Sequence, residues 1–151
     1  MRSATANLTA FCSNRPLVHV QTAMAALDKS EDQVLAMIES GKLLWAWNIA
    51  SKSAARRELR IWRASVLASL NDAPQPDSTE EEVLASLFPH PAPILTTPQV
   101  QRMLSASQCH VYRLIESGAL QALNKAHGGR LGYVRVTRAS VCDFLKLRRV
   151  L

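Results

Sequence analysis

Apolar positions recur at helical spacing in two short stretches of the chain, TTPQVQRML (96–104) and QCHVYRLIES (108–117). Thr97, followed by a proline, predicts the start of the first helix, because a capping residue and then proline are typical of helix beginnings. Gly118 predicts the end of the second helix, since glycine adopts a left-handed conformation without steric cost. A short break, Ser-Ala-Ser (105–107), separates the two stretches. The pattern predicts a helix-turn-helix.

The residues that follow alternate between apolar and polar, which is typical of strands. Residues 120–123 and 133–136 flank the turn HGGRLG (127–132), and this arrangement predicts a β-hairpin. A further amphipathic segment, RASVCDFLKL (138–147), predicts a last helix that begins near Thr137. Helix, turn, helix, hairpin and helix is the order of a winged helix-turn-helix.

The same pattern occurs earlier in the chain. Shifted by 77 positions, IESGKL (38–43) falls on IESGAL (115–120), and shifted by 75, RIWRASV (60–66) falls on RVTRASV (135–141). The two-residue difference predicts a loop of variable length between these matches, because loops accept insertions readily. We infer two copies of one unit of about 55 residues.

Between the copies lies a proline-bounded connector. Its middle, STEEEVLASLF (78–88), predicts a short helix capped by Ser78 or Thr79, with an apolar face that docks on one of the domains. The predicted fold class is mainly α with small β-hairpins (α+β), namely two winged helix-turn-helix domains joined by a linker with a short helix. The predicted divisions are an N-terminal extension (1–17), a degenerate winged helix-turn-helix (18–70), an acidic linker (71–93) and a DNA-binding winged helix-turn-helix (94–151).

The charges divide the chain in the same way. The net charge is +4 over residues 1–70, −5 over 71–93 and +7 over 94–151. Two basic blocks suggest a polyanionic partner, although many basic proteins bind no nucleic acid.

The second copy, from LTTPQVQRML through VYRLIESGAL and the GGR turn to RASVCDFL, resembles the excisionase and MerR-type winged-helix family over residues 95–147. The resemblance implies sequence-directed binding of double-stranded DNA, by a transcriptional regulator or a recombination accessory factor. The first copy departs from the family pattern where its second helix begins, with Ser-Glu-Asp-Gln (30–33). We therefore expect the second copy to be the main reader of DNA.

The candidate DNA contacts lie on the second helix of each copy, on the first-helix start and on the wings. In the second copy, the first turn of the second helix is where side chains meet base edges in the major groove. The wings carry arginine and lysine that suit phosphates or a minor groove. Solvated surface residues are the alternative interpretation. The candidates are Thr97, Ser107, Gln108, Cys109, His110, Tyr112, Arg113, Lys125, Arg130 and Arg135 in the second copy, and Lys52, Arg56, Arg57 and Arg60 in the first.

Three tryptophans belong to the hairpin of the first copy. Trp45 and Trp47 alternate on one strand, and Trp62 ends the partner strand. They predict either sheet core or an exposed aromatic surface for self-association, since aromatic residues are enriched at interfaces.

Nothing in the sequence favours catalysis. The four histidines and three cysteines lack paired metal-ligand spacing, and no glycine-rich phosphate loop follows a strand. We expect a non-enzyme with no cofactor, no metal, no small-molecule ligand and no membrane partner. The scattered cysteines and the lack of a long apolar run favour a cytoplasmic, nucleoid-associated protein.

The function predicted from the sequence is sequence-specific DNA binding as a transcriptional regulator, in the form of a repressor. An excisionase-like recombination directionality factor is one alternative. A protein–protein adaptor that uses degenerate winged helices is another. These alternatives imply a further partner, which is a second copy of the chain in a homodimer, a recombinase or another protein.

Overall fold

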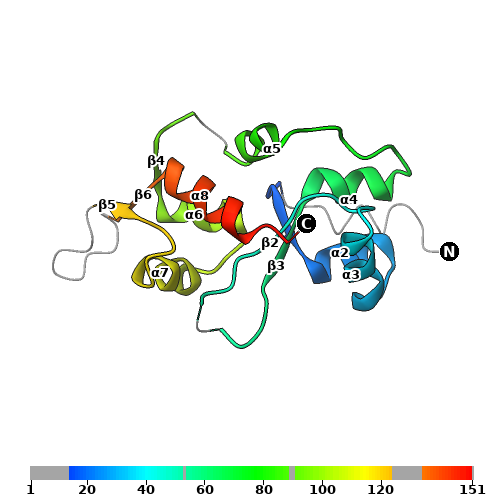
Figure 1. Cartoon of the computed structure of the whole chain (residues 1–151), viewed down its shortest axis with the longest axis horizontal. Helices are drawn as coiled ribbons and strands as arrows, with labels where there is room; N and C mark the ends of the chain where they lie inside the picture. Colours follow the sequence, from blue (N-terminus) through cyan, green and yellow to red (C-terminus); the bar gives the residue numbers. More distant parts are fainter. Residues whose placement is uncertain (1–13, 53, 89–90, 124–133, 151) are drawn as a thin grey trace.

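The computed structural model describes residues 14–52, 54–88, 91–123 and 134–150. In this part of the chain the protein is α+β, with seven helices and two antiparallel three-stranded sheets (Figure 1). None of the described helices is both long and apolar enough to cross a membrane.

The first half contains one sheet and three helices. A short strand leads into two helices joined by a three-residue turn, and a hairpin and a helix follow. The strand order is β1-β3-β2. The elements are β1 (Leu17–His19), α2 (Val20–Leu27), α3 (Glu31–Glu39), β2 (Ala46–Asn48), β3 (Leu59–Trp62) and α4 (Arg63–Leu70).

The second half follows the linker helix α5 (Glu80–Ser86) and has the same order of elements. Its strand order, β4-β6-β5, matches that of the first sheet. The elements are β4 (Ile94–Thr96), α6 (Thr97–Leu104), α7 (Gln108–Glu116), β5 (Ala122–Leu123), β6 (Arg135–Thr137) and α8 (Arg138–Arg148).

Matching hydrogen bonds occur in the two halves. The Leu44 N–H donates to Ser65 Oγ at 2.8 Å, and at the corresponding place the Gln121 N–H donates to Ser140 Oγ at 2.7 Å. Each bond ties the chain after the helix pair to the first turn of the last helix. The sequence repeat is therefore also a repeat of local geometry.

The helix boundaries follow the predicted signals with one correction. Ser107 Oγ accepts a hydrogen bond from the His110 N–H at 3.1 Å, and Gly118 has a φ of 80°, so the predicted cap and the predicted left-handed end of α7 are both confirmed. The predicted cap of α6 was wrong by one position. Thr96 caps this helix, and Thr97 is its first residue, with Pro98 after it.

A short strand precedes each helix pair, and neither strand was predicted from the sequence. β1 and β4 each have three residues and pair with the strand before the last helix, with Leu17 opposite Trp62 and Ile94 opposite Thr137. Leu17 is fully buried, so the first unit begins within what was predicted to be an N-terminal extension.

The first half has two more residues than the second between the matched segments, and one of them lies just before β2. Ala46 pairs with Ile61, and Ala122 pairs with Val136, which places one insertion between Leu43 and Ala46. There Trp45 has a φ of 69°, a conformation that costs an L-residue about 1–2 kcal/mol. The Trp45 ring stacks on Trp47 with centroids 6.5 Å apart, and this packing helps to hold the strained residue.

The hydrophobic core crosses the linker. Val34, Ile38 and their neighbours form a cluster within the first half. A larger cluster joins Trp47 and Ile49 of the first half to Leu114 of the second. The two halves therefore share one core.

The linker helix α5 docks on this shared core, as predicted. Arg149 donates to Glu80 at 3.3 Å, and Lys146 lies 3.4 Å from Glu81, so the end of α8 holds the acidic side of α5. The apolar residues of the helix and of its C-terminal flank are all buried: Val83, Leu84, Leu87 and Phe88.

The last described residues extend the first sheet. The Val150 N–H donates to the Ala46 carbonyl at 2.8 Å, and the backbone of Arg149 forms an isolated antiparallel β-bridge with that of Trp47. The Arg149 guanidinium also lies 4.0 Å from the centroid of the Trp45 ring. The end of the second half thus covers the β2 edge of the first.

Because Trp47 is fully buried in the shared core, replacing it should destabilise the whole protein. We expect Trp47→Ala to lower the free energy of unfolding by about 3–5 kcal/mol, measured by urea denaturation. Leu147→Ala is the control, because Leu147 is 85% exposed, and its effect should stay within about 0.5 kcal/mol. Equal effects of the two changes would contradict the shared core.

Candidate nucleic-acid interface

Helix α7 presents a polar and basic face to solvent. Gln108 and Cys109 in its first turn are exposed, and Arg113 is exposed one turn later. Ser107, which is also exposed, uses its hydroxyl as the cap. Tyr112 is only half exposed and packs against the core. Gln108, Cys109 and Arg113 are therefore the predicted contacts on α7 whose side chains a ligand can reach.

The equivalent face of α3 has the opposite character. Glu31, Asp32 and Ala36 stand 77 positions before those three residues, and all are exposed. Two carboxylates in the first turn would be repelled by phosphates, and the alanine cannot replace an arginine. Of these two helices, only α7 suits a polyanion.

The expectation that His110 meets a base edge is not met. Its side chain is only 7% exposed, because the two halves pack together at this residue. Nε2 lies 2.6 Å from the Ile49 carbonyl oxygen, and Nδ1 lies 3.9 Å from a carboxylate oxygen of Glu58. In the neutral imidazole, Nε2 carries the hydrogen and donates a hydrogen bond to this carbonyl. His110 joins α7 to the first half.

Arg60, predicted as a contact to DNA phosphates, is also buried, with 5% exposure. Its Nε donates to the Leu104 carbonyl at 2.9 Å, and its Nη2 donates to the Ser105 carbonyl at 2.9 Å. Glu58 lies 3.4 Å from Nη2 and balances the charge. The guanidinium therefore holds the turn between α6 and α7 against β3 and cannot reach a phosphate.

Residues 50–58, here called the β2–β3 loop, begin and end beside the first turn of α7. The Ile49 carbonyl just before the loop accepts from His110, and the Ala50 carbonyl accepts from Arg148 at 3.0 Å. At the other end of the loop, Glu58 faces His110. Both ends of the loop are thus attached to the second half.

The β2–β3 loop carries the exposed basic residues Lys52, Arg56 and Arg57. In Figure 1 the loop and α7 lie on the lower side of the molecule, and α5 lies at the top. The two ends of the loop are therefore held beside α7, whereas Arg56 and Arg57 line a cleft toward the start of α2 and α3. The acidic linker helix is on the other side.

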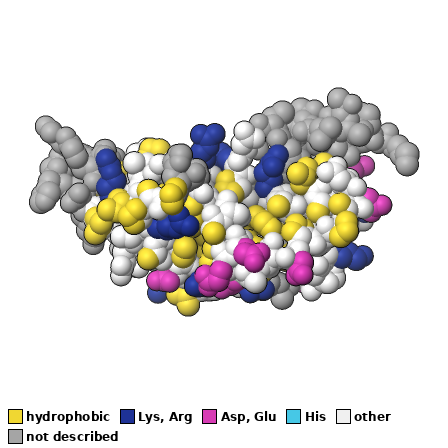
Figure 2. Space-filling model, turned by 90° about the horizontal axis from the view of Figure 1, so that it is seen from above, with side chains coloured by type: hydrophobic (Ala, Val, Ile, Leu, Met, Phe, Trp, Pro, Cys, Tyr) yellow, Lys and Arg dark blue, Asp and Glu magenta, His cyan; other side chains and the backbone are white. Residues whose placement is uncertain are grey.

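Figure 2, a view from the α5 side, shows acidic side chains mainly along its lower edge and scattered Lys or Arg side chains on the same face. Glu81 and Glu82 of the linker helix are exposed. Phosphate groups would be repelled there.

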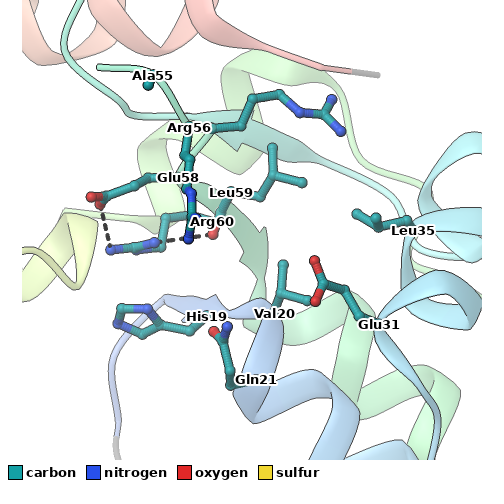
Figure 3. Close-up of a pocket in the computed structure, with 11 residues that line it drawn as sticks. His19, Val20, Gln21, Glu31, Leu35, Ala55, Arg56, Glu58, Leu59 and Arg60 are labelled. Atoms are coloured by element: carbon teal, nitrogen blue, oxygen red, sulfur yellow. Dashed lines mark hydrogen bonds and ion pairs between the residues drawn. The ribbon is translucent and has the colours of Figure 1, made fainter. Parts of the chain in front are cut away.

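A cleft of about 740 Å³ lies between the β2–β3 loop and the start of α2 and α3. Figure 3 shows Arg56 on one rim and the Glu31 carboxylate on the other. Burial, and then the positive charge of Arg60, lower the pKa of His19, which also lines the cleft. The His19 imidazole is therefore neutral at neutral pH, and the basic groups of the cleft that a ligand can reach are those of the loop.

The remaining predicted contacts differ in their surroundings. Thr97 is 6% exposed, so its hydroxyl is buried at the start of α6 and does not face solvent. Arg135 is half-buried in β6 and donates to the Val134 carbonyl at 3.0 Å. Lys125 and Arg130 lie outside the described residues.

The tryptophans belong to the core. Trp45, Trp47 and Trp62 are each at most 9% exposed and pack in the cluster shared with the second half. The core interpretation is confirmed, and the predicted exposed aromatic surface does not exist, because the second half of the same chain covers it.

Within the described residues, no group of three or more His, Cys, Asp or Glu side chains could hold a metal ion. Scans of the chain against protein-family models, curated proteins and solved structures found no match.

Arg60 satisfies two carbonyls with one planar fork, which lysine cannot reproduce. We expect Arg60→Lys to lower the free energy of unfolding by about 1–3 kcal/mol, since a buried carbonyl loses its donor. Arg57→Lys, an exposed change of the same kind in the loop, is the matched control and should have little effect. Denaturant titration of both variants measures the difference, and equal stability would refute the buried role of Arg60.

Proposed function

We propose that this protein binds double-stranded DNA in a sequence-specific manner and acts as a transcriptional repressor by occupying its site. The proposed surface consists of the exposed face of α7 and the β2–β3 loop. Gln108, Cys109 and Arg113 would read bases, and Lys52, Arg56 and Arg57 would contact phosphates.

The order of elements supports this proposal. A strand, two helices joined by a short turn, a hairpin and a last helix occur in both halves, and this order is typical of winged helix-turn-helix proteins. In such proteins the first turn of the second helix enters the major groove. In this chain that helix is α7, and its first turn contains no acidic residue.

The observation that carries the proposal is the position of the basic loop. His110 and Arg148 hold the start of the loop on the second half, beside the turn of α7 that would enter the groove. Arg56 and Arg57 extend from this loop along the cleft toward α2 and α3, where they would bind phosphates that lie beyond the groove entered by α7. Phosphate contacts set the orientation in which a helix reads bases. The two halves would then bind one duplex as a single body.

The chemistry of the α7 side chains suits base edges. Arginine can donate two hydrogen bonds to guanine, and glutamine can pair in the same way with adenine. Arg113 and Gln108 are both exposed on α7 and have no acidic residue in the first turn beside them. Occupancy of a promoter by such a surface would exclude polymerase.

Selection of bound duplexes from a random pool tests the proposal. We expect an enriched motif, and we expect Arg113→Ala to weaken binding to it by about 1–3 kcal/mol and to relax the preference at one position. Arg102→Ala is the matched control, because it removes the same charge from an exposed site on α6. That variant should retain the motif.

Two results would contradict the proposal. One is binding of duplexes that weakens with salt but enriches no motif. That result would show that the positive charge attracts DNA without any reading of its sequence. The other is an equal loss for Arg113→Ala and Arg102→Ala. Either result would favour a protein–protein adaptor over a reader of DNA.

A further inference from the structure

The outer face of the first sheet is an internal docking surface. Leu17, Trp47 and Trp62 point away from the core of their own half and pack in the cluster shared with the second half. Arg60 on the same face binds the turn between α6 and α7. This face is therefore covered by a helix-turn-helix that follows it in the chain.

The second sheet has the same face, and two apolar residues on it are exposed. By strand register, Ile94 takes the place of Leu17, Leu123 that of Trp47 and Arg135 that of Arg60. Ile94 is 46% exposed and Leu123 is 45% exposed, whereas Leu17 and Trp47 are fully buried. Among the described residues, Leu147 is the only other large hydrophobic side chain exposed to this degree.

The turn between α2 and α3 is the matching part of the first half. In the second half, the equivalent turn docks through Ser105, whose Oγ donates to the Leu17 carbonyl at 2.6 Å, and through His110 on the following helix. The equivalents of these residues are Asp28 and Gln33, which are both exposed. Asp28 has the left-handed φ of 54° that corresponds to 50° at Ser105. The docking shape is thus present in the first half and uncovered.

We propose that a second copy of this chain docks its α2–α3 turn on the outer face of the β4-β6-β5 sheet. The contact would repeat between molecules the contact that already joins the two halves. The contact is heterologous, because it joins the turn of one copy to the sheet face of the other. An assembly of any size therefore keeps one uncovered turn at one end and one uncovered sheet face at the other, and it is open-ended.

The charges fit this partner. Residues 28–32 carry exposed Asp28, Glu31 and Asp32 against one exposed lysine, Lys29, a net charge of −2 (three acids less one lysine), and the receiving face carries Arg135. The acidic character that makes α3 unsuited to DNA is then complementary to the basic second half. Thr137 replaces Trp62 and Leu123 replaces Trp47, so the intermolecular contact buries less apolar surface and is weaker than the internal one.

Sedimentation of the full chain at micromolar to millimolar concentrations tests this proposal without DNA, so its outcome does not depend on the proposed function. We expect the weight-average mass to rise continuously with concentration, without a plateau at the dimer. Leu123→Glu removes the receiving face and Asp28→Arg reverses the charge of the turn. Each variant should sediment as a monomer, and circular dichroism should confirm that each is folded.

A mixture of the two variants decides the geometry. Leu123→Glu retains an intact turn, and Asp28→Arg retains an intact sheet face, so together they should form a 1:1 dimer and stop there. Leu147→Glu, an acidic change at the other exposed leucine, should assemble like the unmodified protein. A monomer at all concentrations would overturn the proposal. So would an assembly that Leu123→Glu leaves intact, or variants that do not form a dimer when mixed.

Discussion

The structure depends most on the buried guanidinium of Arg60. From β3 it donates to the carbonyls of Leu104 and Ser105, which lie 44 and 45 positions further along the chain. These carbonyls belong to a helix end and a tight turn, where the helix itself offers no donor. Arg60 supplies the donors, Glu58 offsets its charge, and the two halves are joined in one orientation. Trp47 of the shared core is paired with Arg60 across the β2–β3 ladder.

This junction gives the repeated unit two different uses. In the first half the outer sheet face receives the turn between α6 and α7 of the second half, while α7 keeps one face in solvent. The positions that are basic or neutral on α7 are acidic or small on α3, although the backbones correspond. By the proposed function, the repeated order of elements would then offer a surface for DNA on the second half and, by the inference above, a surface for another protein molecule on the first.

Much of the fold could be predicted from the sequence, because helix periodicity, caps and glycine positions are local signals. The helices of both halves and the docking of α5 followed from such signals. The strands β1 and β4 could not be predicted, since three residues are too short to show alternation. The helix cap was predicted at Thr97 and not at Thr96, because two threonines precede Pro98 and either one fits the pattern.

The candidate site was harder to predict, because burial between the halves is a tertiary property. Arg60 and His110 are polar residues in a hairpin and in the first turn of a helix, where exposure is the usual outcome. One signal was available for Arg60. Arg60 alternates with Leu59 and Ile61 along its strand and so shares a face of the sheet with Trp62. Aromatic residues from two strands lie on this face, which indicates that another part of the protein covers it. His110 offered no such signal.

The central claim is that α7 and the β2–β3 loop contact one duplex as a single surface. Iron–EDTA tethered at Glu116→Cys on α7, and separately at Ala54→Cys in the loop, would cleave the DNA nearest to each position, in variants whose native cysteines are serine; both sites are exposed and outside the proposed contacts. If both elements contact one duplex, the two cleavage centres lie within about one helical turn, roughly 10 base pairs, of each other on the selected duplex. Cleavage from position 116 alone, or centres several helical turns apart, would show that they do not.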